Sequence, residues 1–263
     1  GSSAGQNVLG DSNAAIGRRT GMNVTGSNNA ALGVTAGQSV IGNSNIAIGE
    51  SAGSSVTANN TISLGKAARA AANNSIAIGA SNVVTGQNSG AIGTPNTIGG
   101  TGSYALGNNN TINGNGTFVI GNNVTSSSKD AVILGNNSTD GGANTVSVGA
   151  VGTERKIVNV APGIIASGST DAVNGGQLYT LSASASTGIA SLSTGVPSLS
   201  TGLSTANSNL TSLSTSASTG IASLSTGVSS LSTGLSTTNS NLVDLSTSAS
   251  TGISSLSTGL STT

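Results

Sequence analysis

The chain has 263 residues with seven basic and seven acidic side chains, 40 glycines, and no His, Cys or Trp. The missing His and Cys exclude the commonest general base, the thiolate nucleophile, cysteine zinc sites and disulfides. Zero net charge with 5% charged residues argues against a nucleic-acid partner, which needs Lys and Arg concentrated on one face. We therefore expect no enzyme activity, no cofactor and no metal.

Large core side chains are scarce. Tyr104, Phe118 and Tyr179 are all the aromatic residues, and a compact core normally draws much of its buried area from such residues. A chain of this composition is either disordered or buries small side chains in a regular array, and internal periodicity distinguishes the two.

A triplet of a small residue, an aliphatic residue and Gly repeats along the first half of the chain. The steps between triplet glycines are 16 residues three times and then 14 residues six times, at Gly17, Gly33, Gly49, Gly65, Gly79, Gly93, Gly107, Gly121, Gly135 and Gly149. Another small residue stands seven positions before each triplet glycine. Two short strands and two tight corners per period predict a parallel β-solenoid of about ten coils, each stacked about 4.8 Å above the last.

The alternation within each triplet strand predicts which side chains are buried. Aliphatic pairs such as Ile46 with Ile48 and Ile76 with Ile78 have the period of two that is typical of a strand with one buried face. We expect these pairs to point inwards. The matching inward residues of the other half-coil are Val8, Val24, Val40, Val56, Val84, Ile98 and Ile112.

The small residues between the aliphatic pairs are then expected to face outwards, at Ala15, Ala31, Ala47, Ala77, Ala91 and Ala105. A lone column buries little, and we predict that copies of the chain associate through this small-residue face. Polar pairs such as Ser44-Asn45 and Asn60-Thr61 are expected to form turns by bonding their own backbone.

The repeat stops at Gly152, and three charges follow at Glu154, Arg155 and Lys156. They form either a solvated turn or a set of ion pairs between subunits. Further on, Thr170 or Asp171 is the expected N-cap of a helix, and Asn174 with Gln177 offers a second, weaker start.

This junction resembles the neck of the trimeric autotransporter adhesins, the family with a YadA-like head. The resemblance lies in Arg-Lys-Ile-Val-Asn-Val-Ala-Pro-Gly at 155–163 and Asp-Ala-Val-Asn-Gly-Gly-Gln-Leu at 171–178, and repeats such as Asn-Ser-Ile-Ala-Ile-Gly at 74–79 resemble the head of that family. It implies a homotrimer, a left-handed parallel β-roll head, and a neck that crosses between subunits. Its expected neck packing residues are Ile157, Val160, Val173 and Leu178.

Beyond the neck a 32-residue repeat begins at Leu181, Leu213 and Leu245. Its apolar residues are spaced four and three apart with one additional step of four per repeat, which predicts a nearly straight coiled coil. Regular glycines and Pro197 oppose a helix, so a disordered Ser/Thr linker is the alternative. The core residues alone would favour a dimer, and the trimer follows only from the resemblance.

The predicted organisation is a β-roll head over 1–152, a neck over 153–177 and a coiled-coil stalk over 178–263. Basic residues in the head offer candidates for an anionic host ligand, with solvated loop charges as the alternative, at Arg18, Arg19, Lys66 and Arg69. No apolar run reaches the length of a membrane span. The family's signal peptide and C-terminal barrel anchor are missing here, so we interpret the chain as an excised passenger fragment.

The expected function is a non-enzymatic bacterial cell-surface adhesin that attaches to host cells or extracellular matrix, or aggregates with itself, through multivalent contacts. Location at the cell surface, anchored to the outer membrane, follows from the resemblance. One alternative is a purely structural spacer whose ligand-binding domain lies upstream. Another is an ice-binding solenoid, whose outward column Thr25, Thr57 and Thr85 is interrupted at Ile41.

Overall fold

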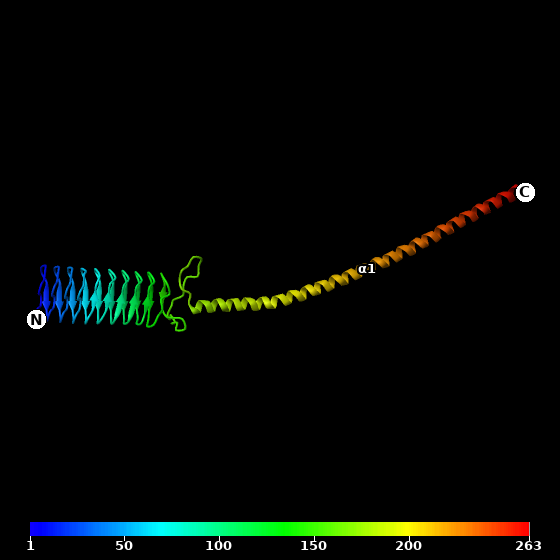
Figure 1. Ribbon diagram of the computed structural model, residues 1–263. Coiled ribbons are helices and arrows are strands. Elements are labelled where there is room, and N and C mark those ends of the chain that lie inside the picture. Colours follow the sequence, from blue (N-terminus) through cyan, green and yellow to red (C-terminus); the bar gives the residue numbers. More distant parts are fainter. Residues whose placement is uncertain (263) are drawn as a thin grey trace. The chain divides into compact units, whose positions relative to one another are not determined.

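The computed structural model describes residues 1–262. Their contacts divide the chain into two units, Gly1–Val158 and the part from Asn159 onwards. The first unit is a parallel β-solenoid, drawn from blue to green in Figure 1, and the second is a neck segment followed by one long helix. A solenoid of about ten coils followed by a helix is confirmed.

One wall of the solenoid is a ten-stranded parallel sheet in which each strand pairs with the strand of the next coil. Corresponding residues lie in register, so that Ile46 pairs with Ile62 and Ile62 with Ile76. In spatial order the strands are β1 (Ala14–Ile16), β2 (Ala30–Leu32), β3 (Ile46–Ile48), β4 (Ile62–Leu64), β6 (Ile76–Ile78), β8 (Gly90–Ile92), β10 (Tyr104–Leu106), β12 (Phe118–Ile120), β14 (Val132–Leu134) and β15 (Val146–Ser147).

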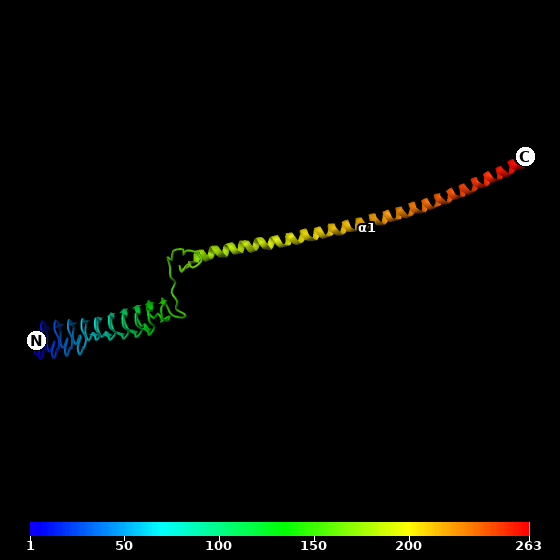
Figure 2. The same ribbon diagram turned by 90° about the horizontal axis from the view of Figure 1, so that it is seen from above.

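The opposite wall is a shorter sheet of five parallel strands. They are β5 (Arg69–Ala70), β7 (Val83–Val84), β9 (Asn96–Ile98), β11 (Asn110–Ile112) and β13 (Thr125–Ser126). In the 16-residue coils this wall is reduced to single parallel bridges that join Leu9, Thr25, Ile41 and Thr57. Figure 2 shows the same stack of coils from above. In the 16-residue coils the two additional residues widen the turn, and the strand of this wall is shortened to a single bridged residue.

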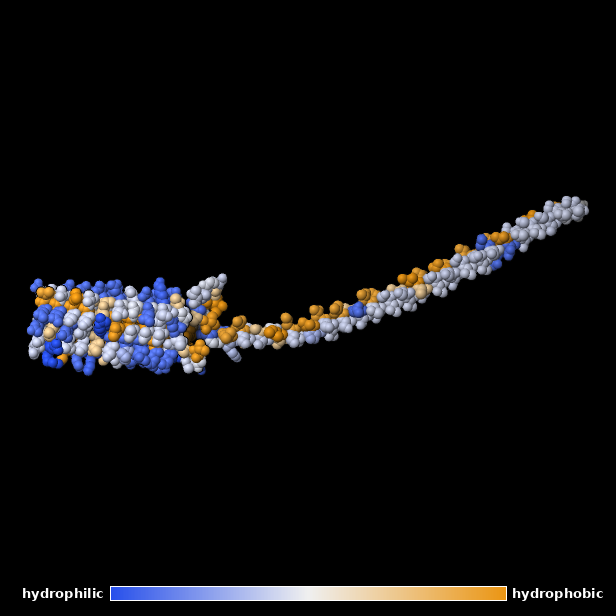
Figure 3. Space-filling view, in the orientation of Figure 1, coloured by the Kyte–Doolittle hydropathy of each residue, from blue (hydrophilic) through white to orange (hydrophobic). Residues whose placement is uncertain are grey.

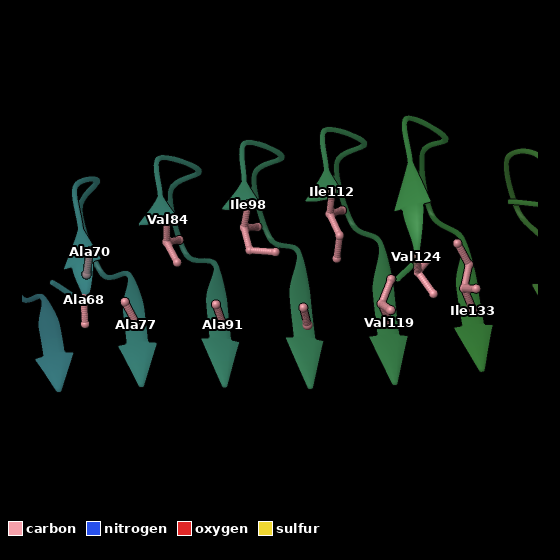
Figure 4. Close-up of a cluster of buried hydrophobic side chains, with 11 residues drawn as sticks. Ala68, Ala70, Ala77, Val84, Ala91, Ile98, Ile112, Val119, Val124 and Ile133 are labelled. Carbon is pink, nitrogen blue, oxygen red and sulfur yellow. The ribbon is translucent and has the colours of Figure 1, made fainter. Parts of the chain in front are cut away.

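In the 14-residue coils the core is one cluster of side chains from both walls, whereas in the 16-residue coils it divides into two separate clusters. Val84, Ile98 and Ile112 are completely buried, and Figure 4 shows them pointing towards the strands of the long sheet, which carry Ala77, Ala91 and Val119. The expectation that these residues point inwards is confirmed, as it is for Val24, Val40 and Val56; Val8 is partly buried.

The expected orientation of the long-sheet strands is wrong. Ala47 and Ala77 are buried in the interior, whereas Ile48 and Leu106 are 38% and 50% exposed. Large side chains of the short sheet, such as Ile98, fill most of the narrow space between the walls, so most inward positions of the long sheet hold small residues, with Val119 and Ile133 as exceptions. The small residues therefore cannot form an association surface, and the aliphatic pairs lie on the outside.

Glycine is required at the coil corners by close stacking. Gly65 has φ +128°, and a Cβ on it would lie 2.6 Å from the carbonyl oxygen of Gly79 in the next coil. A Cβ on Gly33 would likewise lie 2.7 Å from the carbonyl oxygen of Gly49. A side chain at these corners would push the coils apart.

Asparagine and serine side chains bond between coils. Asn96 accepts from the main-chain nitrogen of Asn110 at 3.1 Å, and its own amide donates to Asn82 Oδ1 at 3.0 Å and to Gly107 O at 2.8 Å. Ser44 and Asn60 are turn residues with positive φ, but their neighbours Asn45 and Thr61 are buried and bond to adjacent coils. The expectation of local turn bonding is therefore wrong for the second residue of each pair.

Two charged residues close the end of the solenoid near residue 150. Asp140 accepts from Ser126 Oγ at 2.8 Å and from the main-chain nitrogens of Ser128 and Gly142 at 3.1 and 2.8 Å. Arg155 donates to Val148 O and Asn136 O, both at 2.7 Å. Arg155 thus covers the carbonyl groups of the last coils within its own chain and is not a merely solvated turn residue.

The second unit is organised around the start of helix α1 (Gly175–Ser261). Asn174 is the N-cap and forms a capping box with Gln177, so the first choice of Thr170 or Asp171 is wrong and the second start is confirmed. Asn174 Nδ2 also donates to Val160 O at 3.0 Å. The capping box satisfies main-chain groups at the start of the helix. Thr170 and Asp171 lie several residues before that start.

Helix α1 continues through its glycines and Pro197, so the disordered linker is not what the structure shows. No residue of the helix is buried in the single chain. Many threonines donate to the carbonyl four residues earlier, as Thr201 does to Pro197 O at 3.0 Å. Figure 3 shows apolar side chains following one side of the helix.

Candidate interaction surfaces

The outer side of the long sheet carries two rows of side chains, which we call the aliphatic face. Row one is Ala14, Ala30, Ile46, Ile62, Ile76, Gly90, Tyr104, Phe118, Val132 and Val146. Row two is Ile16, Leu32, Ile48, Leu64, Ile78, Ile92, Leu106, Ile120 and Leu134. Most of the larger members are exposed or half-exposed, and a contiguous apolar strip of this kind marks an interaction surface.

The regular aliphatic face changes at three successive coils of row one. The rings of Tyr104 and Phe118 stack with their centroids 5.1 Å apart and an angle of 27° between planes. The Tyr104 ring lies over Gly90, where a Cβ would be 2.7 Å from the ring. Beside them is an apolar notch of about 220 Å³, which Ile76 and Ile92 also line.

A second cavity, of about 340 Å³, lies inside the 16-residue coils. Its lining includes Val24, Val40, Ala31, Asn29 and Asn45. In the 14-residue coils the same space is filled by the larger Ile98 and Ile112. The cavity therefore results from wider coils with smaller interior side chains.

The structure does not bring the four basic candidates of the head into one patch. Arg18 and Lys66 follow equivalent corners three coils apart, about 14 Å at the usual strand spacing, and Lys66 pairs with Glu50 at 3.2 Å. Arg69 lies on β5 of the other wall and donates to Ser55 O at 3.2 Å. Arg19 is an exposed turn residue with φ +57°. A ligand site at these residues stays a prediction.

The expected neck packing residues are mostly exposed in the single chain. Ile157, Val173 and Leu178 are all more than half exposed, and Val160 is intermediate. Their proposed packing between subunits is therefore a prediction about an assembly. Within one chain the neck is held instead by polar residues. Their only sign in the sequence was the pairing of Asn174 with Gln177 as a possible helix start.

Within residues 1–262 no group of three or more acidic or other metal-binding side chains is close enough together to hold a metal ion. Over the same residues no helix combines the length and hydropathy needed to cross a bilayer.

Comparison with known proteins identifies part of the second unit. Residues 156–201 match the family model described as the coiled stalk of trimeric autotransporter adhesin. No curated protein matches the chain.

Two solved structures are similar to the chain. The collagen-binding domain of the Yersinia adhesin YadA is 23% identical, with 54% of this chain and 84% of that one covered and a TM-score of 0.42. The C-terminal YadA-like domain of a Burkholderia pseudomallei protein is 30% identical over 40% of this chain and 50% of that one, with a TM-score of 0.25. The resemblance found in the neck sequence is thus supported over residues 156–201, which are similar to the coiled stalk of trimeric autotransporter adhesins.

Proposed function

We propose that the chain is a non-enzymatic segment of a bacterial cell-surface adhesin that acts as a homotrimer, with a head at 1–152, a neck at 153–177 and a stalk at 178–263. The observation that carries the proposal is the match of residues 156–201 to the coiled stalk of the family. The family implies three copies and a location at the cell surface, anchored to the outer membrane.

The stalk helix supports assembly because it lacks stability of its own. Its eight glycines from Gly188 to Gly259 each cost about 1 kcal/mol relative to Ala, and Pro197 costs about 3 kcal/mol. Each Leu, Ile or Val that becomes buried between helices contributes about 1.5–3 kcal/mol. Side chains such as Leu192, Leu199 and Leu203, all at least 70% exposed in the single chain, would supply that burial in a coiled coil.

The head supports assembly through the aliphatic face. Covering that face with other copies leaves the five-stranded sheet and the corner loops free. On the five-stranded sheet the outward residues Thr97, Thr111 and Thr125 pair in register from coil to coil. A surface that repeats along each column and over three copies suits multivalent attachment, in which many weak contacts add up.

Two measurements test this proposal. Light scattering of the purified chain is expected to give the mass of three copies, and a monomer would contradict the assembly. The trimer is then applied to immobilised collagen, laminin and fibronectin, to host cells, and to bacteria displaying it. Binding or clumping is expected for an adhesin head. Loss of binding in the double variant Arg18→Ser with Arg19→Ser, but not in Lys129→Ser, would place the contact at the corner where Arg18 and Arg19 lie.

The alternative is a spacer that only extends a binding domain elsewhere in the protein. It is favoured by the pairing of Lys66 with Glu50 and by the scattered positions of the other basic residues. A trimer that binds none of these surfaces and causes no aggregation is the result expected for the spacer.

A further inference from the structure

Row two of the aliphatic face is too regular to determine which coil of one copy lies beside which coil of another. Row two contains only Ile and Leu, and its residues recur with every coil. Sliding one copy along another by one coil, about 4.8 Å, would exchange Ile for Leu or leave the residue type unchanged. Volume-conserving swaps of this kind cost little, so row two hardly distinguishes the aligned arrangement from a shifted one.

The stalk has the same weakness. Its apolar residues recur at heptad spacing within a 32-residue repeat, and between Leu178 and Thr262 the single charged residue is Asp244. Coiled coils usually select register and partner through charged pairs beside the core or a polar residue within it. A stalk without such pairs gains little from one alignment over another.

Row one contains the exception. Tyr104 is the one residue of both rows whose side chain has a polar atom, and within residues 1–262 its hydroxyl makes no hydrogen bond. Tyr104 and Phe118 form a raised aromatic step, and Gly90 forms the low position beside it. A small position, a tall polar one and a tall apolar one thus follow one another at three successive levels of the column.

We infer that Gly90, Tyr104 and Phe118 set the axial register between copies of this chain; the inference rests on the proposed homotrimer. Rotational symmetry brings identical residues to the same level. With row one next to the axis of the aligned assembly, the three hydroxyls meet one another and the three Phe118 rings meet one another. A shift of one coil sets the hydroxyl against the Phe118 level or the Gly90 level, where it finds no hydrogen-bonding group. A buried polar group without a partner is disfavoured, as with the single buried Asn that selects register in coiled coils.

Disulfide trapping can measure the register because the described chain has no cysteine of its own. Two full-length copies with tags of different size are co-expressed, each with one cysteine. In the same-level pair both copies carry Leu64→Cys; in the shifted pair one carries Leu64→Cys and the other Ile78→Cys. A disulfide requires Cα atoms about 4.4–6.8 Å apart, so each pair reports one alignment. The same experiment with Ile62 and Ile76 covers row one.

The test variant is Tyr104→Ile with Phe118→Ile, which makes the aromatic levels aliphatic. Its matched control is Leu106→Ile with Ile120→Leu, which changes row two in the same coils. In the parent and the control we expect the same-level band to exceed the shifted band about tenfold or more, the penalty expected for one unpaired hydroxyl. In the test variant the two bands are expected to become comparable. Tyr104→Phe, which keeps the ring, is expected to raise the shifted band partway.

The outcomes separate this inference from the proposed assembly. A monomer by light scattering overturns both. A trimer that crosslinks in neither row shows that the aliphatic face is not the contact and overturns the register inference alone. A trimer in which both aromatic variants still give only the same-level band shows that register is set elsewhere and also overturns it.

Discussion

Gln177 holds both main-chain polar groups of Gly163: its Nε2 donates to Gly163 O at 2.6 Å, and its Oε1 accepts from Gly163 N at 3.0 Å. The same Oε1 accepts from the main-chain nitrogen of the N-cap residue Asn174 at 3.2 Å. One amide therefore ties the neck segment to the first turn of α1.

Gln177→Ala is expected to loosen the neck and the first turns of the helix. It removes two bonds to Gly163 and half of the capping box, a loss of about 1–3 kcal/mol of local stability. Hydrogen exchange of amides in residues 160–185 would measure it. Ser191→Ala, which removes one bond to Thr187 O within the helix, serves as the control and is expected to leave these amides protected.

Gly65→Ala is expected to destabilise the head by roughly 2–5 kcal/mol, because it adds backbone strain to an overlap with the next coil. Gly102 also has positive φ, at +65°, but nothing lies within 4 Å of the position of a Cβ. Gly102→Asn is therefore the matched control, with a small effect. Thermal unfolding followed by calorimetry compares them, and equal losses would contradict the expected strain and overlap at the corner.

Asn96→Ala is expected to cost about 2–4 kcal/mol, since it leaves the buried main-chain nitrogen of Asn110 without its acceptor and opens a space in the core. The exposed Asn109 donates to Asn123 Oδ1 at 2.9 Å and has φ +56°. Asn109→Gly keeps that backbone conformation and is expected to change stability by a few tenths of a kcal/mol. Denaturant titration compares the two variants, and equal midpoints would contradict the importance of the buried hydrogen bonds that Asn96 makes between coils.

Acid is expected to loosen the end of the head through Asp140. Burial raises the pKa of this carboxyl, but hydrogen bonds from Gly142 N, Ser126 Oγ and Ser128 outweigh it and lower the pKa from 3.8 to about 2. Because the folded-state pKa lies below the unfolded value, the stabilisation is fully present above about pH 4 and disappears as the pH falls towards 2. Hydrogen exchange of the Ser127, Ser128 and Gly142 amides, which donate to Asp140, should show this loss in the parent and in Asp130→Asn, and its absence in Asp140→Asn.

Leu106→Asp is expected to dissociate the proposed trimer of the head while leaving each solenoid folded, because its side chain points away from the interior. Three carboxylates brought together in an apolar contact would repel one another and lose hydration. Thr97→Asp on the outer side of the five-stranded sheet is the control. Crosslinking of Leu64→Cys copies reports head contact, and unchanged crosslinking in Leu106→Asp would exclude the aliphatic face.

The repeat was predictable because glycine spacing follows directly from coil length, and Val84 and Ile98 were correctly expected inside. Which side of the other strand is buried was not predictable from alternation, since Ile46-Ala47-Ile48 has the same period whichever side faces the core. The width of the coil decides it, and that width depends on the opposite wall. Arg155 was equally difficult, since its acceptors at Asn136 and Val148 are brought together only by the end of the stack.

Hydrogen bonds between coils run along the column, so a pull between its first and last coils loads them one level at a time. Each coil that peels away releases 14 or 16 residues, about 45–55 Å of extended chain. A lone column under tension would therefore lengthen in many small steps at low force. In the proposed trimer, three copies joined at the same levels would have to yield together, so side-by-side assembly would supply the mechanical strength.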